Sequence, residues 1–123
     1  MITKKSKVAT DCEHLIQAYL AAAVSFGDTQ RNRDFEAGNQ FATDLGRLGK
    51  ALREAESGKR LLLQVLPHED PYVRIWAAGD CLSFAPNVAV PVLEEIEATK
   101  GLLGTTARMT LSEWKAGRLF KNS

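Results

Sequence analysis

Three consecutive side chains, His68, Glu69 and Asp70, could each bind a metal ion or transfer a proton. A metal site needs three or four ligands that converge on one point. The next residue supports a simpler interpretation, because Pro71 stands where a helix needs no N–H, and an aspartate before it can cap that helix. The sequence therefore predicts that Asp70 caps a helix and that no metal is bound here.

The cysteines and the other histidine offer little further chemistry. Cys12 and His14 are two residues apart, so on a helix they do not face each other. Neither cysteine stands in a Cys-x-x-Cys pair, and Cys81 suits a small core residue. Reduced thiols are expected, although one long-range disulfide stays open. The sequence contains no phosphate-binding loop, nucleophile elbow or paired-histidine zinc motif, so we predict no catalytic residue and no cofactor.

Asp80 and Arg74 are the candidates for a pocket between helices. At 100° per residue, Asp80 falls near Trp76 and Val73 on an apolar side of its helix. A buried carboxylate must be paired or hydrogen-bonded, so Asp80 is expected to meet a basic group or a helix end. The alternative is a functional carboxylate in a cleft. Arg74, on the same helix, could recognise a ligand in such a pocket.

The apolar residues recur at helical spacing throughout, which predicts an all-α fold of about six helices without a sheet. Thr10 and Glu13 match a capping box, in which a hydroxyl and a carboxylate bond the first N–H groups of a helix. Gly27 and Asp28 are expected to end this first helix near Phe26.

The second helix is expected to run from about Thr29 to Glu56 with two distinct faces. Its apolar side contains Gly38 and Gly49, where a missing side chain lets another helix approach closely; the alternative is a ligand held against the exposed backbone. Its other side is an uninterrupted row of polar residues, which we call the polar stripe: Glu36, Gln40, Thr43, Arg47, Lys50 and Glu54.

A short helix and a central helix are expected next. Gly58 is a candidate C-cap for the second helix. The crowded apolar residues of 61–66 predict a short helix that is buried nearly all round and stopped by Pro67. The helix that begins at Pro71 is apolar on two sides, so it is expected to lie between neighbours at the centre of the fold.

Two further helices complete the chain. Pro86 and Pro91 must lie before the next helix or in its first turn, because a later proline would break it. The last helix is expected over 103–116. Trp76 and Trp114 fall on apolar stripes, so both are expected to be largely buried.

The composition is that of an ordinary globular protein. With 123 residues one domain is expected, and the formal charge of +1 argues against a dedicated nucleic-acid binder. Weak binding of nucleic acid through Arg31, Arg33, Arg47 and Lys50 is the least favoured function. Neither a secretory signal nor a membrane-spanning run is recognised, so a cytoplasmic chain is expected. The expected parts are a basic tail (1–9), one helical domain (10–118) and a C-terminal tail (119–123).

The stretch LLLQVLPHEDPYVRIWAAGDCL, residues 61–82, resembles the junction between the two helices of a HEAT repeat. The matching positions are Leu62, Leu63, Leu66, Asp70, Pro71, Val73, Arg74, Ala77, Ala78 and Leu82. The following VAVPVLEEI resembles the partner helix, and together with LSEWKAG near the end the chain resembles a small bacterial HEAT-like family of unknown function. The resemblance implies an α-α superhelix, in which Arg74 would support the turn between the two helices; this is the first of two roles expected for Arg74, and ligand recognition is the other. It brings with it no activity, cofactor or catalytic residue.

These observations favour a non-catalytic module that binds another protein, since helical repeats offer extended, rigid surfaces. The partner and the oligomeric state are unknown; a bacterial immunity or adaptor protein is one form of this hypothesis. The polar stripe is the expected partner-binding surface, through Glu36, Gln40, Arg47, Lys50 and Glu54. The alternative is a small-ligand binder or an enzyme. A deep pocket that holds Asp80, Arg74 and a histidine together would favour this alternative.

Overall fold

Six α-helices and no strand make up residues 7–120, which are the residues that the computed structural model describes. The all-helical prediction is confirmed. The helices are α1 (Lys7–Arg31), α2 (Phe35–Arg53), α3 (Glu56–Gln64), α4 (Pro71–Cys81), α5 (Pro86–Glu97) and α6 (Leu102–Lys115).

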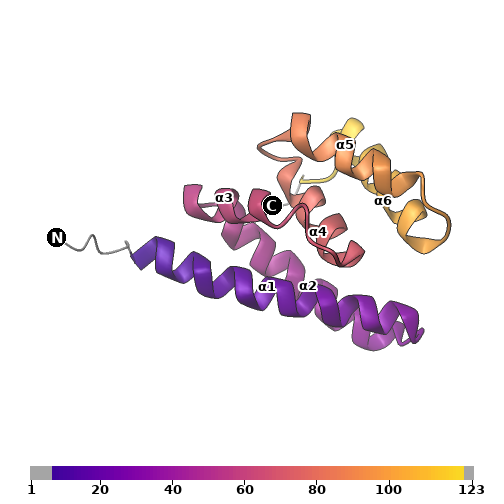
Figure 1. Ribbon diagram of the computed structural model, residues 1–123, viewed down its shortest axis with the longest axis horizontal. Coiled ribbons are helices and arrows are strands. Elements are labelled where there is room, and N and C mark those ends of the chain that lie inside the picture. Colours follow the sequence, from indigo (N-terminus) through magenta and orange to yellow (C-terminus); the bar gives the residue numbers. More distant parts are fainter. Residues whose placement is uncertain (1–6, 121–123) are drawn as a thin grey trace.

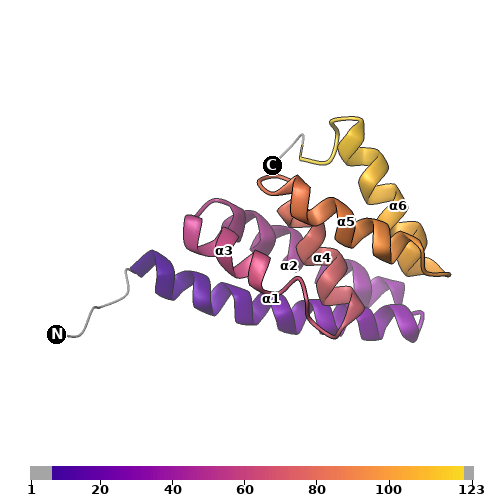
Figure 2. The same ribbon diagram turned by 45° about the horizontal axis from the view of Figure 1, so that its top comes forward.

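The helices form a long hairpin, a central pair and a second hairpin (Figure 1). The long helices α1 and α2 run side by side, with α3 and α4 against them, and α5 and α6 follow beyond α4 (Figure 2). The central helix is α4, because it contacts each of the other five. In contrast, α6 contacts α5 and α4 but none of α1, α2 and α3 within the described chain.

One apolar core joins the first five helices. Its largest fully buried side chains come from α1 to α5 and from the turn after α4: Tyr19, Leu45, Leu52, Leu62, Val73, Cys81, Leu82 and Leu93. From α6 the core receives Ala107 and Leu111. The core is therefore continuous, but α6 joins it along one edge only.

The first two helices meet at a different place from the one predicted. The predicted end near Phe26 is wrong, because α1 continues to Arg31 and contains Gly27. A Cβ on Gly27 would lie 2.7 Å from the Tyr72 ring, so this glycine serves helix packing and not termination. The chain reverses through Arg33, which has a positive φ of 59°, and Asp34 caps α2 by accepting the Ala37 N–H at 3.2 Å.

The start of α1 also differs. The helix already includes Lys7, so Thr10 does not cap it, and the expected tail over residues 1–9 ends earlier. Residues 1–6 of that tail and 121–123 of the C-terminal tail lie outside the described residues.

Three expectations about the shorter helices are also wrong. Gly58 does not cap α2: it lies inside α3, where a Cβ would overlap the Leu52 carbonyl. Helix α3 is not buried all round, since Leu62 is buried while Leu61 and Leu63 are half-buried. Pro91 lies beyond the first turn of α5, which begins at Pro86.

Pro91 removes only one backbone bond from α5, the one that the Asn87 carbonyl would accept. Asn87 is exposed, so water can reach that carbonyl and the helix continues. Gly101 precedes α6 with a φ of 93°, and Gly117 follows it with a φ of 76°, so both glycines stand where the chain turns out of a helix.

Trp76 and Trp114 are each mostly buried, as predicted, although neither is fully enclosed. Both pack against the edge of the core. The fold provides the reason for Trp76: it faces the side of α4 that α6 leaves partly uncovered.

Candidate functional site

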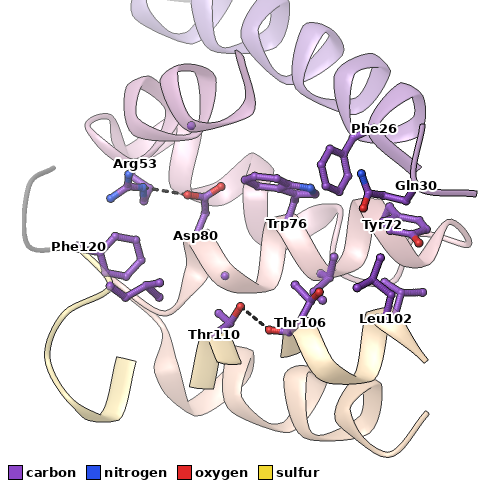
Figure 3. A pocket seen from close by; sticks show the side chains of 15 residues that line it. Phe26, Gln30, Arg53, Tyr72, Trp76, Asp80, Leu102, Thr106, Thr110 and Phe120 are labelled. Carbon is purple, nitrogen blue, oxygen red and sulfur yellow. Dashed lines mark hydrogen bonds and ion pairs between the residues drawn. The ribbon is translucent and has the colours of Figure 1, made fainter. Parts of the chain in front are cut away.

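An open groove lies between α4 and α6 and has a volume of about 350 Å³. It exists because α6 packs on α5 and α4 but does not reach α1 or α2. Figure 3 shows the side chains that line it. Most are apolar or aromatic, and they come from α1, α2, α4, α6 and the segment after α6: Phe26, Gln30, Gly46, Arg53, Tyr72, Ile75, Trp76, Gly79, Asp80, Leu102, Leu103, Thr106, Thr110, Leu119 and Phe120.

Aromatic rings form one end of the groove. Phe26 stands edge-on to Trp76, with ring centroids 5.4 Å apart and an interplanar angle of 89°, and edge-on to Tyr72 at 5.9 Å. The Arg31 guanidinium covers the Tyr72 ring at 5.1 Å from its centroid. Edge-to-face pairs of this kind hold rings in fixed positions, so this end is a rigid apolar wall (Figure 3).

A buried ion pair forms the other end. One oxygen of Asp80, Oδ1, lies 3.1 Å from Arg53 Nε, and the other, Oδ2, accepts the Tyr19 hydroxyl at 2.6 Å. The two charged side chains are only 13% and 14% exposed. The prediction that Asp80 is paired with a basic group is confirmed, and the pair links α1, α2 and α4.

Gly49 makes room for this carboxylate. A Cβ at Gly49 would lie 2.5 Å from Asp80 Oδ2 and 2.8 Å from Oδ1. The predicted close approach at Gly49 is therefore present. A Cβ at Gly38 would likewise lie 2.8 Å from the Thr29 hydroxyl and from the Gln30 amide of the neighbouring helix.

Burial raises the pKa of Asp80 from 3.8 to about 6, although the Tyr19 hydrogen bond and the Arg53 charge act in the opposite direction. Burial and the neighbouring Asp80 charge also raise the pKa of Tyr19 well above its usual value. The pKa of Cys81 rises to about 12, first through burial and then through Asp80. Tyr19 therefore acts as a neutral hydrogen-bond donor, and Cys81 is an unreactive core thiol.

Arg53 stands where the groove meets a second hollow. Its guanidinium lies over the Phe120 ring at 4.6 Å from the centroid. The hollow beyond it has a volume of about 470 Å³ and a mixed-charge lining of Lys50, Arg53, Glu54, Lys59, Ser83 and Phe84. We call this the charged hollow. The groove thus leads from an aromatic wall to a basic residue and then to further charges.

Arg74, the second predicted pocket residue, does not line the groove. Its Nε donates to the Leu66 carbonyl at 3.1 Å, and its Nη1 lies 3.5 Å from Glu95 Oε1. Six residues along a helix correspond to a rotation of about 120° from Asp80, so the two side chains point apart. Arg74 instead supports the turn between α3 and α4, which was the first of its two expected roles.

The sequence analysis missed Arg53. A usable signal existed, since Arg53 follows Gly49 by one helical turn and lies on the same face of α2. Gly49 leaves room for a carboxylate, and Arg53, one turn later, supplies the opposite charge. Together they can accommodate a buried acidic side chain.

Residues 68–70 are held by hydrogen bonds at the start of α4. Asp70 accepts the Tyr72 N–H at 2.8 Å, so the predicted cap is confirmed. His68 Nδ1 accepts the Asp70 N–H at 2.9 Å. No group of three potential metal ligands occurs within residues 7–120. Cys12 and Cys81 are both free and buried.

The polar stripe is exposed along its whole length. Arg47 lies 3.7 Å from Asp44 on the same helix. Lys50 and Glu54, at the end of the stripe, also line the charged hollow. The stripe and the groove therefore meet through this hollow.

The fold belongs to a wider class of small all-helical proteins. The chain resembles the crystal structure of the protein RPA1889 from Rhodopseudomonas palustris CGA009, with a TM-score of 0.78 and 21% sequence identity over 93% of this chain and 96% of that one. The likeness shows a shared fold. No protein-family model matches the sequence, and no match was found among curated proteins. In the described part of the chain, no helix is both long and apolar enough to cross a membrane.

Proposed function

We propose that this chain is a non-catalytic module that binds another protein, and that the apolar groove is its principal contact surface. One observation carries the proposal: apolar side chains line a space of about 350 Å³ that the fold leaves open. Leu102 is 51% exposed there, and Trp76 is partly exposed. Exposed apolar surface with a tryptophan and an arginine is typical of the energetic centre of a protein interface.

The rival hypothesis of an enzyme or a small-ligand site rested on a different arrangement. A pocket that held Asp80, Arg74 and a histidine together would have favoured it. Arg74 points elsewhere, and neither His14 nor His68 lines the groove. The Asp80 carboxylate already accepts the Tyr19 hydroxyl on one oxygen and is ion-paired with Arg53 through the other, which supports a structural role at the end of the groove.

The turn between α3 and α4 supports the HEAT-like interpretation that is part of this proposal. Asp70 caps α4, and Arg74 donates to the Leu66 carbonyl within the turn. In a repeat module, paired helices stack to expose a surface for partners. A module that covers one site on one partner would act as an immunity or adaptor protein.

The polar stripe is a second candidate surface, favoured by its exposure and by its connection to the charged hollow. Its mixed charges would select a partner and speed association more than they would strengthen binding. The groove and the stripe can be tested separately because they use different residues.

Capture of a partner from native cell extract tests the proposal, with Gly79→Leu as the groove-filling variant. Gly79 lines the groove, and a Cβ there would have only the Thr110 methyl within 4 Å, at 3.8 Å. A leucine would therefore fill the groove, whereas Gly79→Ala adds one methyl and serves as the matched control. We expect a captured protein with wild type and Gly79→Ala, and its loss with Gly79→Leu.

The double variant Arg47→Glu, Lys50→Glu tests the polar stripe in the same experiment. Loss of the same partner would add the stripe to the interface, and unchanged capture would remove it. Capture that is equal for wild type and Gly79→Leu would contradict the groove as the principal contact surface.

A further inference from the structure

Two glycines in the groove wall have no explanation within the fold. Of the nine glycines, five are packed so closely that a Cβ would meet a neighbouring atom within 3 Å, and Gly101 and Gly117 have positive φ. Gly46 and Gly79 have helical backbones and open space beside them, with nothing nearer than 3.8 Å. Each costs about 1 kcal/mol relative to alanine in a helix. Both line the groove, where they let an occupant approach the backbone.

The chain itself shows what kind of group the groove accepts. After Gly117 the chain turns back, and a paired contact of Arg118 with Glu113, at 2.9 Å for both bonds, fixes that turn. Leu119 and Phe120 then line one end of the groove, and the Phe120 ring packs on the Arg53 guanidinium. Large apolar side chains of a peptide are thus already seated at this end.

The polar groups at that end select for a negative charge. Oδ2 of Asp80 accepts the Tyr19 hydroxyl, and Oδ1 lies 3.1 Å from Arg53 Nε in an ion pair. The Arg53 guanidinium forms no hydrogen bond within the described chain, so its Nη N–H groups remain for an acceptor. The adjoining charged hollow adds Lys50 and Lys59, of which Lys59 is already paired with Glu56 at 3.2 Å. A carboxylate that reached this point would find charge-assisted donors with little competition.

We propose that the groove binds a peptide segment of the partner protein that carries large apolar side chains followed by a carboxylate, and that Arg53 receives the carboxylate. This inference rests on the proposed function and specifies its partner. The apolar side chains would lie between α4 and α6, close to Gly46 and Gly79. The carboxylate would come from an acidic side chain or from a chain end.

Selection from a library of random displayed dodecapeptides tests the inference with the full chain. We expect enriched peptides that combine large apolar residues with an acidic residue or a terminal carboxylate. For one enriched peptide, a twin with the carboxylate replaced by the amide should bind wild type about tenfold more weakly, the usual effect of losing one charge-assisted bond. Gly79→Leu should bind neither peptide, and Gly79→Ala should bind as wild type does.

The double variant Arg53→Gln, Asp80→Asn tests the role of Arg53 without leaving a lone buried charge. It removes both charges with little change in shape, and circular dichroism checks that it folds. We expect it to bind the peptide and its amide twin equally. Discrimination that persists in this variant would overturn the role assigned to Arg53.

Two results separate failure of this inference from failure of the proposed function. Enriched peptides that depend on Gly79 but bind wild type as well as their amide twins do would overturn the carboxylate preference and leave the groove as a protein-binding surface. No Gly79-dependent peptide would overturn both. Dodecanoate is tested separately as a small amphiphile. If no peptide is selected, and if dodecanoate binds wild type but not Gly79→Leu, the groove is assigned to a small amphiphile and not to a peptide.

Discussion

Two faces of the first four helices use glycine in opposite ways. Among α1 to α4, glycines are joints at which helices touch: Gly27 meets Tyr72, Gly49 meets the Asp80 carboxylate, and Gly58 meets the Leu52 carbonyl. On the side that faces α6, Gly46 and Gly79 meet almost nothing. A glycine within a helix therefore indicates close packing only where a neighbouring side chain or backbone lies against it. Where no neighbour is present, the empty space itself needs an explanation.

The largest effect is expected at Gly58. A Cβ there would overlap the Leu52 carbonyl, and a backbone atom inside a packed helix cannot move aside as a side chain can. Gly58→Ala should therefore lower the free energy of unfolding by about 3 kcal/mol, at the upper end of overpacking effects. Urea unfolding measures this. The control, Gly46→Ala, should be neutral or stabilise by up to about 1 kcal/mol. Equal effects of the two changes would remove the contrast between the joints and the groove wall.

A smaller effect is expected from the titration of Asp80. Its folded pKa, about 6, lies above its usual 3.8 because of burial. The folded state therefore holds the proton more tightly than the unfolded state. The stability that this proton contributes is complete below about pH 4 and is lost as the pH rises through about 6.

The Asp80→Asn variant is the reference for this titration, because asparagine has no proton to lose in this pH range. Between pH 4 and pH 6.5, wild type should lose on the order of 2 to 3 kcal/mol of unfolding free energy relative to the Asn variant. Chemical unfolding at several pH values gives the two curves. Parallel curves across this range would show that burial does not raise the pKa of Asp80 in the folded protein.

Trp76 should contribute less to stability than a tryptophan in a closed core. It is partly exposed in the groove wall, so Trp76→Ala should cost about 1 to 2 kcal/mol. Loss of a fully buried tryptophan would cost about 3 to 5 kcal/mol. Thermal unfolding distinguishes the two values, and a loss in the higher range would mean that α6 covers Trp76 in solution and closes the groove.

Local patterns in the sequence predicted the elements that depend on neighbours in the chain. The Asp70 cap needs only the residues that follow it, and the two apolar sides of 71–81 place α4 at the centre. The close approach of another helix at Gly49 was also predicted correctly. In contrast, Gly27 was misread as a helix end, because its real reason is the Tyr72 ring 45 residues away along the chain.

The groove itself could not be predicted, because it depends on how α6 is placed relative to α1 and α2. No residue pattern fixes that placement: Trp76 was interpreted simply as part of an apolar stripe that other helices would cover, and Leu102 fell outside the predicted last helix. The pairing of Asp80 with a basic group was predictable from burial alone. Its partner was not, since Arg53 comes from another helix and Arg74, nearer in sequence, points away.

Site-directed photocrosslinking tests the groove most directly. A photoreactive phenylalanine analogue placed at Leu102, which is 51% exposed inside the groove, would report contact with a partner in native extract. The same analogue at Val88, an apolar residue 42% exposed on α5 and outside the groove, is the matched control. We predict one crosslinked protein from position 102, none from position 88, and loss of the crosslink when Gly79→Leu is added. Crosslinking of the same protein from position 88 alone, or from position 102 irrespective of Gly79→Leu, would contradict the groove as the binding surface.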